Sequence, residues 1–113
     1  IVVVLDHLLL AEADVTHGLK AGGIIVLNTP MAHDTYDFKN FRLATADVTA
    51  ISVEAGLSHG MINTGIIGSL EKATTLLGMD ILIQGIEEEF RTRKPQKNSL
   101  AAKIAYERTV TGG

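Results

Sequence analysis

The stretch that decides the fold is Gly22-Gly23-Ile24-Ile25-Val26-Leu27-Asn28-Thr29. Four consecutive aliphatic residues without polar alternation are typical of a strand covered on both faces, as in a parallel sheet between layers of helix. The glycine pair before the run is a typical helix stop and turn. The two polar residues after it lie where the strand is expected to end.

A second buried run, Ile1-Val2-Val3-Val4-Leu5, precedes the first. The 18 residues between the two runs, 6–23, are too many for a hairpin and enough for a helical crossover. Two strands joined in this way predict a right-handed βαβ unit. A weaker third strand is predicted over residues 43–46, after a polar loop.

The second half of the chain has helical spacing and predicts four helices, whose expected first or capping residues are Asp47, Asn63, Asp80 and Asn98. Gly56 and Gly78 are the expected stops of the first two helices. Gly68 lies inside the second, where glycine costs about 1 kcal/mol relative to alanine, so we expect close packing against another backbone. Residues 109–113 are predicted to be a frayed tail.

These elements predict an α/β fold: a Rossmann-like, three-layer α/β/α arrangement with a mainly parallel sheet and a helix-rich C-terminal half. The length of 113 residues and the 46% hydrophobic content fit one packed domain. The chain begins inside an apparent buried strand. We therefore expect N-terminal strands of the domain to be missing, and residues 1–113 to be its C-terminal part.

Composition excludes several classes of function. A net charge of −3 gives no basic field for nucleic acid or anionic lipid, and the apolar runs are shorter than the roughly 20 residues of a membrane span. The absence of cysteine excludes disulfides, thiol catalysis and iron–sulfur clusters held by this chain. The four histidines lack metal-ligand spacing, so no metal site is predicted. We expect a cytoplasmic location.

Polar residues follow each predicted strand: Asp6-His7, Asn28-Thr29 and Asp47. Ligands of open parallel sheets bind beyond the carboxyl ends of the strands, so these residues predict a ligand crevice. We predict that Asn28 and Thr29 bind a cofactor there. The alternative is that these side chains only cap helices and start turns.

Asn63-Thr64 opens the second helix, where free backbone N–H groups and the positive dipole end can receive a carboxylate or phosphate. We predict both as cofactor-binding residues, and a plain packing helix is the alternative. The sequence contains no recognisable motif that pairs a nucleophile with a base, so no catalytic residue is predicted.

Several short segments form an ordered set: 2–6, 14–29, 46–49, Asn63-Thr64 with Gly68 and Lys72, Phe90, 97–98 and 105–107. Their order and spacing resemble the gamma subunit of the 2-oxoacid:ferredoxin oxidoreductases, the family of pyruvate synthase and 2-ketoisovalerate oxidoreductase. The sequence departs from that family in lacking the initial strand and its glycine-rich turn. It also departs at Gly65-Ile66-Ile67 and Leu70, which are packing changes.

The resemblance implies an enzyme complex that decarboxylates pyruvate or a related 2-oxoacid on thiamine diphosphate and Mg²⁺. Electrons would pass through iron–sulfur clusters to ferredoxin, and the acyl group to coenzyme A. The partners implied are alpha, beta and delta subunits in a hetero-oligomer. This chain would be a non-catalytic gamma subunit, binding no cofactor alone, that shapes coenzyme A access and assembly. The alternative is a self-contained nucleotide- or coenzyme-binding α/β module.

Overall fold

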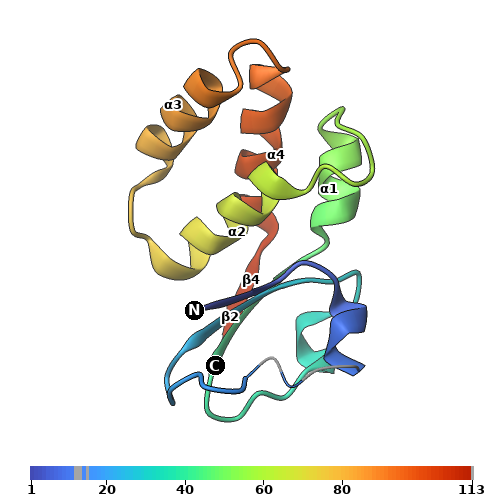
Figure 1. Cartoon of the computed structure of the whole chain (residues 1–113), viewed down its shortest axis with the longest axis vertical. Helices are drawn as coiled ribbons and strands as arrows, with labels where there is room; N and C mark the ends of the chain where they lie inside the picture. Colours follow the sequence, from blue (N-terminus) through green and yellow to red (C-terminus); the bar gives the residue numbers. More distant parts are fainter. Residues whose placement is uncertain (12–13, 15, 113) are drawn as a thin grey trace.

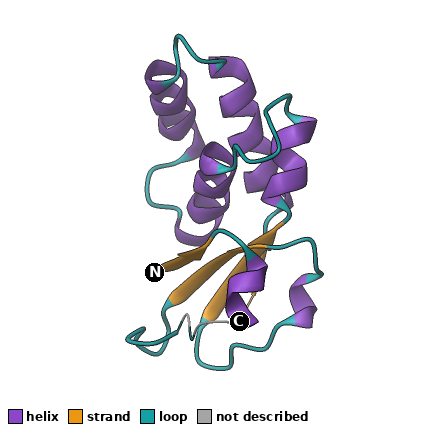
Figure 2. Ribbon diagram, turned by 45° about the vertical axis from the view of Figure 1, so that its right-hand side comes forward, coloured by secondary structure: helices purple, strands orange, loops and turns teal. Residues whose placement is uncertain are grey.

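A computed structural model describes residues 1–11, 14 and 16–112, and its centre is a four-stranded sheet (Figures 1 and 2). The strands, in spatial order, are β1 (Val2–Val4), β2 (Ile24–Asn28), β3 (Arg42–Ala46) and β4 (Val110–Gly112). The first three are parallel and β4 is antiparallel to β3. The predicted α/β class and the mainly parallel sheet are confirmed.

The sheet separates two layers of different construction. On one face lie α1 (Val48–Glu54), α2 (Asn63–Thr74) and α4 (Pro95–Arg108), with α3 (Met79–Glu89) beyond them. On the other face lie two short 3₁₀ helices, η1 (His7–Ala11) and η2 (His33–Thr35), and the loops around them. The described part of the second layer therefore consists of short 3₁₀ helices, turns and loops.

Successive side chains of the central strands point to opposite faces of the sheet and pack into two hydrophobic cores. Val26 and Ala44, which are register partners, face the helices and pack with Ile51, Ile66 and Ala105. The residues next to them in the strands, including Ile25 and Leu43, face the other way and pack against aromatic and leucine side chains of the loop layer. The continuous aliphatic run of β2 is therefore explained by burial on both faces.

Two glycines of α2 allow the helical layer to close. A Cβ at Gly68 would overlap the backbone carbonyl of Ala102 in α4 and lie 2.9 Å from its Cα atom. A Cβ at Gly65 would lie 2.6 Å from Cγ1 of Val48 in α1. The expected reason for Gly68, close approach to another backbone, is confirmed. The same helix thus sets the positions of both neighbours.

Polar contacts secure the same packing. The Thr64 hydroxyl donates to Oδ1 of Asn98 at 3.0 Å, and the hydroxyl oxygens of Thr109 and Ser69 lie 2.8 Å apart, both contacts being buried. Lys72 places its ammonium 4.8 Å from the centroid of the Tyr106 ring. The two buried hydrogen bonds, at Thr64 and Thr109, are worth about 1 kcal/mol each.

The predicted helical crossover between β1 and β2 is wrong for the described residues, which form only η1 and turns; residues 12, 13 and 15 lie outside the description. Asp6 accepts a hydrogen bond from the Leu8 N–H and so starts a short local turn. Gly18 and Gly22 have φ values of +79° and +83°, which an α-helix does not contain.

Three predicted helix boundaries also need correction. Asn63 is the first helical residue of α2 and the cap position is Ile62, while the helix ends at a left-handed Thr75 before the expected stop at Gly78. Asn98 lies inside α4, which begins at Pro95 because proline needs no N–H partner in the first turn. In contrast, Asp47 caps α1 as expected.

The predicted frayed tail is wrong as well. Residues 110–112 form β4, and Thr111 pairs with Ala44 in the sheet. Thr109, which is buried, anchors this turn from helix to strand by donating to the Ala105 carbonyl at 2.5 Å. Short-range sequence signals do not report a pairing with a strand more than sixty positions earlier.

Gly68→Ala should destabilise the chain by about 2 kcal/mol or more, because overpacking against a rigid backbone outweighs the gain in helix propensity. Gly85→Ala in α3 is the matched control, since nothing lies within 4 Å of a Cβ built there. It should leave stability equal or raise it by up to about 1 kcal/mol. Urea unfolding of both variants measures the difference, and equal effects at the two sites would contradict the packing account.

Candidate functional site

A cleft lies where the chain leaves β2 and β3 in opposite directions. The connection after β2 passes to the loop layer, where Tyr36 and Phe38 pack on the sheet. The connection after β3 passes to the helical layer, where Val48 and Ile51 of α1 pack on the opposite face. Such a point of divergence opens a crevice at the carboxyl ends of the strands, which is where α/β sheets bind ligands.

The cleft has a volume of about 560 Å³ and contains most of the predicted strand-end residues. Asp6 and His7 after β1, Asn28 at the end of β2, and Asp47 after β3 all line it. Leu5 and Val53, which are 48% and 50% exposed, form an apolar part of its wall. A volume of this size suits a small organic ligand.

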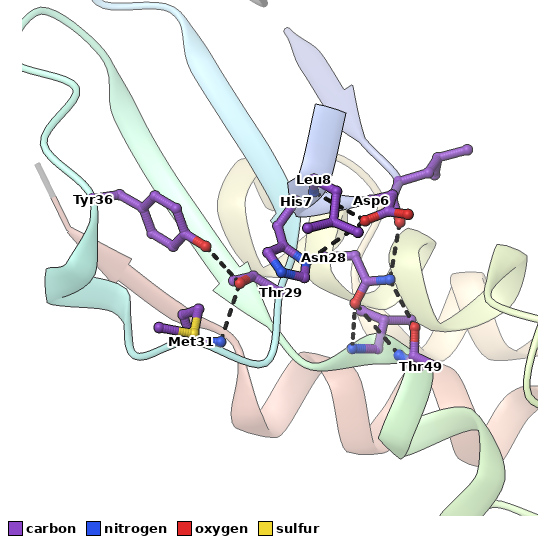
Figure 3. A network of polar contacts seen from close by, with 10 residues as sticks. Asp6, His7, Leu8, Asn28, Thr29, Met31, Tyr36 and Thr49 are labelled. Atoms are coloured by element: carbon purple, nitrogen blue, oxygen red, sulfur yellow. Dashed lines mark hydrogen bonds and ion pairs between the residues drawn. The ribbon is translucent and has the colours of Figure 1, made fainter. Parts of the chain in front are cut away.

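Asn28 is the structural centre of this cleft (Figure 3). Its amide nitrogen donates to the Leu5 carbonyl and to the Thr49 hydroxyl, each at 3.0 Å. Its Oδ1 atom accepts from the backbone N–H groups of Val48 at 2.8 Å and Thr49 at 3.4 Å. One buried side chain therefore joins the end of β1, the end of β2 and the start of α1.

The acidic residues of the cleft have local partners and remaining acceptor capacity. Asp6 accepts from the Leu8 N–H at 3.0 Å, and its carboxylate lies 3.6 Å from Nδ1 of His7. Asp47 accepts from the Ala50 N–H at 3.1 Å and so caps α1. Each carboxylate can accept further hydrogen bonds from hydroxyl or amino groups of a ligand.

Thr29 lies beside the cleft and stabilises the loop after β2. It is 2% exposed, its hydroxyl is 2.6 Å from the Tyr36 hydroxyl, and it accepts from the Met31 N–H at 3.1 Å (Figure 3). The bond to the Met31 N–H, two residues further on, is the local contact by which a threonine side chain stabilises a turn. The contribution of Thr29 to a ligand site remains a prediction.

Asn63 and Thr64 lie outside the cleft and differ from each other. Asn63 is exposed at the first residue of α2, and this helix has no side-chain cap. Thr64 is 1% exposed and its hydroxyl is bonded to Asn98. Of the pair, Asn63 has the side chain that can meet a ligand or partner, whereas Thr64 ties α2 to α4.

The cleft includes two polar residues that sequence reasoning did not select as site residues, Thr49 and His59. Thr49 follows the cap residue Asp47 by two positions, so its place in the first turn of α1 was a usable signal. His59 comes from the loop between α1 and α2, whose path has no periodic pattern. Its position therefore depends on packing that the sequence alone does not specify.

The described residues contain no group of three histidine, aspartate or glutamate side chains that could hold a metal ion. Glu54 and Arg108 form an ion pair at the far end of α1. Glu54 accepts from both terminal nitrogens of Arg108 at 2.5 and 2.8 Å, and these hydrogen bonds hold the pKa of the Glu54 carboxyl below its ordinary value. This fork ties α1 to the last turn of α4.

The model of the family described as pyruvate ferredoxin/flavodoxin oxidoreductase matches residues 1–108. The chain belongs to this family. It is 38% identical over 112 residues to the pyruvate synthase subunit PorC of Methanothermobacter marburgensis, covering 99% of this chain and 61% of the relative. It is 39% identical over 114 residues to the pyruvate/ketoisovalerate oxidoreductases common subunit gamma of Thermococcus kodakarensis, covering 97% and 61%.

A solved structure has the same fold. The crystal structure of pyruvate oxidoreductase subunit PORC from Thermotoga maritima superposes with a TM-score of 0.74 at 22% identity, covering 88% of this chain and 57% of that one. The chain thus spans about three fifths of the length of the relatives it matches. Among the described residues, no helix is long and apolar enough to cross a membrane.

Asn28→Ala should destabilise the chain by about 2 kcal/mol or more, because it leaves the Val48 N–H and the Leu5 carbonyl without their partner. Asn40→Ala is the control, since Asn40 is exposed and has no side-chain hydrogen bond among the described residues. Chemical denaturation followed by circular dichroism measures both. A loss for Asn28→Ala no larger than that for Asn40→Ala would show that Asn28 does not hold the strand ends together.

Proposed function

We propose that this chain is the gamma subunit of a 2-oxoacid:ferredoxin oxidoreductase that converts pyruvate or a related 2-oxoacid to acyl-coenzyme A. The observation that carries this proposal is the family match over residues 1–108. The relatives named as PorC or as a common gamma subunit support it, since they align with almost the whole chain.

The residues of this chain favour an accessory role. Iron–sulfur clusters require thiolate ligands in most proteins, and the sequence has no cysteine. The cleft combines carboxylates, an amide and imidazoles without a nucleophile held by a base. Thiamine diphosphate, Mg²⁺ and the clusters would therefore be held by alpha, beta and delta subunits, and ferredoxin would accept electrons from the complex.

The sheet edge supports incorporation into a larger domain. Val3 is 39% exposed, while its register partner Val26 on β2 is fully buried beneath the helices. Ile1, two positions before Val3, is 62% exposed. We propose that these residues are covered in the full-length protein, of which residues 1–113 form the C-terminal part of one gamma-type domain.

The cleft and the start of α2 are the places where this chain would influence coenzyme A. The cleft opens at the carboxyl ends of the strands and is lined by both apolar and polar side chains. Asn63 is exposed in the first turn of a 12-residue helix, where backbone N–H groups lack partners within the helix, and such an end suits a phosphate or a carboxylate. We propose that these surfaces shape coenzyme A access in the assembled enzyme.

A tagged full-length protein, expressed with the other subunits from its own source, should co-purify with them in fixed proportion and with thiamine diphosphate and iron bound to the assembly. Mass spectrometry, cofactor analysis and acyl-coenzyme A formation check this. A stable protein that elutes alone under these conditions, with no oxidoreductase activity recovered in its fraction, would contradict the subunit assignment.

The cleft also favours a second candidate, a self-contained nucleotide- or coenzyme-binding module. Calorimetry separates the two candidates. Tight binding of coenzyme A or a nucleotide to the isolated chain, combined with failure to assemble, is the result that favours the module. Binding that appears only in the assembled complex favours the subunit.

Asn63→Ala should lower acyl-coenzyme A formation by the assembled enzyme, mainly through KM for coenzyme A, while stability stays within about 0.5 kcal/mol of the wild type. The side chain is exposed and does not cap the helix, so a loss of activity would not be an indirect effect of folding. Asn40→Ala is the matched control. Unchanged kinetics for Asn63→Ala would remove this residue from the proposed contact.

A further inference from the structure

The arrangement of α3 differs from that of the other three helices. Its buried residues, Leu82 and Ile86, pack with Ala102 of α4 in a small core of their own, separate from the core on the sheet. Ile81 on the same helix is 61% exposed. Figure 1 shows α3 on the outer side of the helical layer, away from the strands. The helix is therefore attached mainly through one neighbour.

The connection before α3 is strained and lacks an apolar anchor. Thr75 is left-handed with φ of 51°, a conformation that costs energy in a β-branched residue. Leu76 and Leu77, which follow, are 73% and 57% exposed. Burial of side chains consequently does not explain why this connection keeps its path.

Glu71 of α2 supplies the missing attachment. Its residue is 5% exposed, and its Oε1 atom accepts from the Leu77 N–H at 2.6 Å and from the Gly78 N–H at 3.0 Å. Its Oε2 atom lies 3.3 Å from the Leu77 nitrogen. Hydrogen bonds to an ionised carboxylate are roughly twice as strong as neutral ones, so this side chain fixes the connection directly.

The connection after α3 has the same construction. Lys94 is left-handed with φ of 55°. Asn98 of α4, which is 3% exposed, donates to the carbonyls of Arg93 at 3.1 Å and Lys94 at 3.0 Å. Its Oδ1 atom accepts the Thr64 hydroxyl, so the tie extends to the start of α2. Each end of α3 thus combines a strained residue with one buried polar side chain that holds the backbone.

We propose that residues 75–94 form a hinged arm that opens as one unit about Thr75 and Lys94, with Glu71 and Asn98 as the positioning residues that keep it closed. Opening releases both left-handed residues, separates the small α3–α4 core and breaks the hydrogen bond that Ser99 donates to Glu87. Such a segment is expected to have a lower opening free energy than the rest of the domain. The proposal is independent of the oxidoreductase assignment.

Amide hydrogen exchange of the full chain tests the arm. In Glu71→Gln, the amides of α3 should exchange roughly tenfold faster or more, because the charge and one of the acceptors are lost. Protection in α1, α4 and the sheet should stay at the wild-type level. Glu88→Gln is the control, since Glu88 is an exposed carboxylate of α3 paired with Arg91 at 2.6 Å; it should leave exchange within a factor of about two.

Lys94→Gly should have the opposite effect on the exchange rate of α3. Glycine adopts a positive φ without strain, so the closed arm is no longer strained at position 94. Opening then relieves no strain there, and the amides of α3 should exchange more slowly than in the wild type. Unchanged α3 protection in Glu71→Gln would overturn the proposal. An equal loss of protection in every element would also overturn it, because α3 would then open only with the whole domain.

Discussion

Gly68 has no side chain, and the backbone of α4 at Ala102 occupies the space that a Cβ atom would take. This approach brings α2 and α4 together over β2 and β3, and buried hydroxyl contacts at Thr64 and Thr109 secure it. The attraction between packed atoms weakens steeply as they separate. A small increase in the distance between these helices would therefore open the core that covers Val26 and Ala44.

The same helix connects the packing to the candidate site. Gly65 lies against Val48, the first residue of α1, and the N–H of Val48 donates to Asn28. Asn28 in turn holds the Leu5 carbonyl beyond β1. A chain of direct contacts therefore runs from the α2–α4 contact, through the start of α1, to the cleft at the strand ends. The shape of the cleft depends on residues that do not line it.

Sequence reasoning predicted those features that local chemistry determines. The aliphatic run of β2 follows from burial on both faces, the Asp47 cap follows from the geometry of a helix start, and the reason for Gly68 follows from the cost of glycine in a helix. In β1 the expected cover on both faces is wrong for one face, where Val3 is 39% exposed. The position of strand-end residues in one cleft follows from parallel topology, since Asp6, Asn28 and Asp47 must meet at one edge.

The errors arise where distant parts of the chain decide the local structure. Residues 110–112 become a strand because β3 offers a free edge, and Asn98 lies within a helix because its side chain satisfies the carbonyls of the preceding turn. Asn28 has turn-forming chemistry in the sequence, yet its partners lie in two distant parts of the chain, after β1 and at the start of α1. Single-sequence patterns report neighbours along the chain, and these contacts are formed by neighbours in space.

A comparison of Gly68→Ala, Ala102→Gly and the double variant by urea unfolding tests most directly whether backbone contact sets the helical layer. The atoms that a Cβ at Gly68 would meet are the carbonyl oxygen, carbonyl carbon and Cα of Ala102, all of which glycine retains. The double variant should therefore be at least as unstable as Gly68→Ala alone. Recovery of wild-type stability in the double variant would contradict the account, because it would show that the Ala102 methyl group limits the approach.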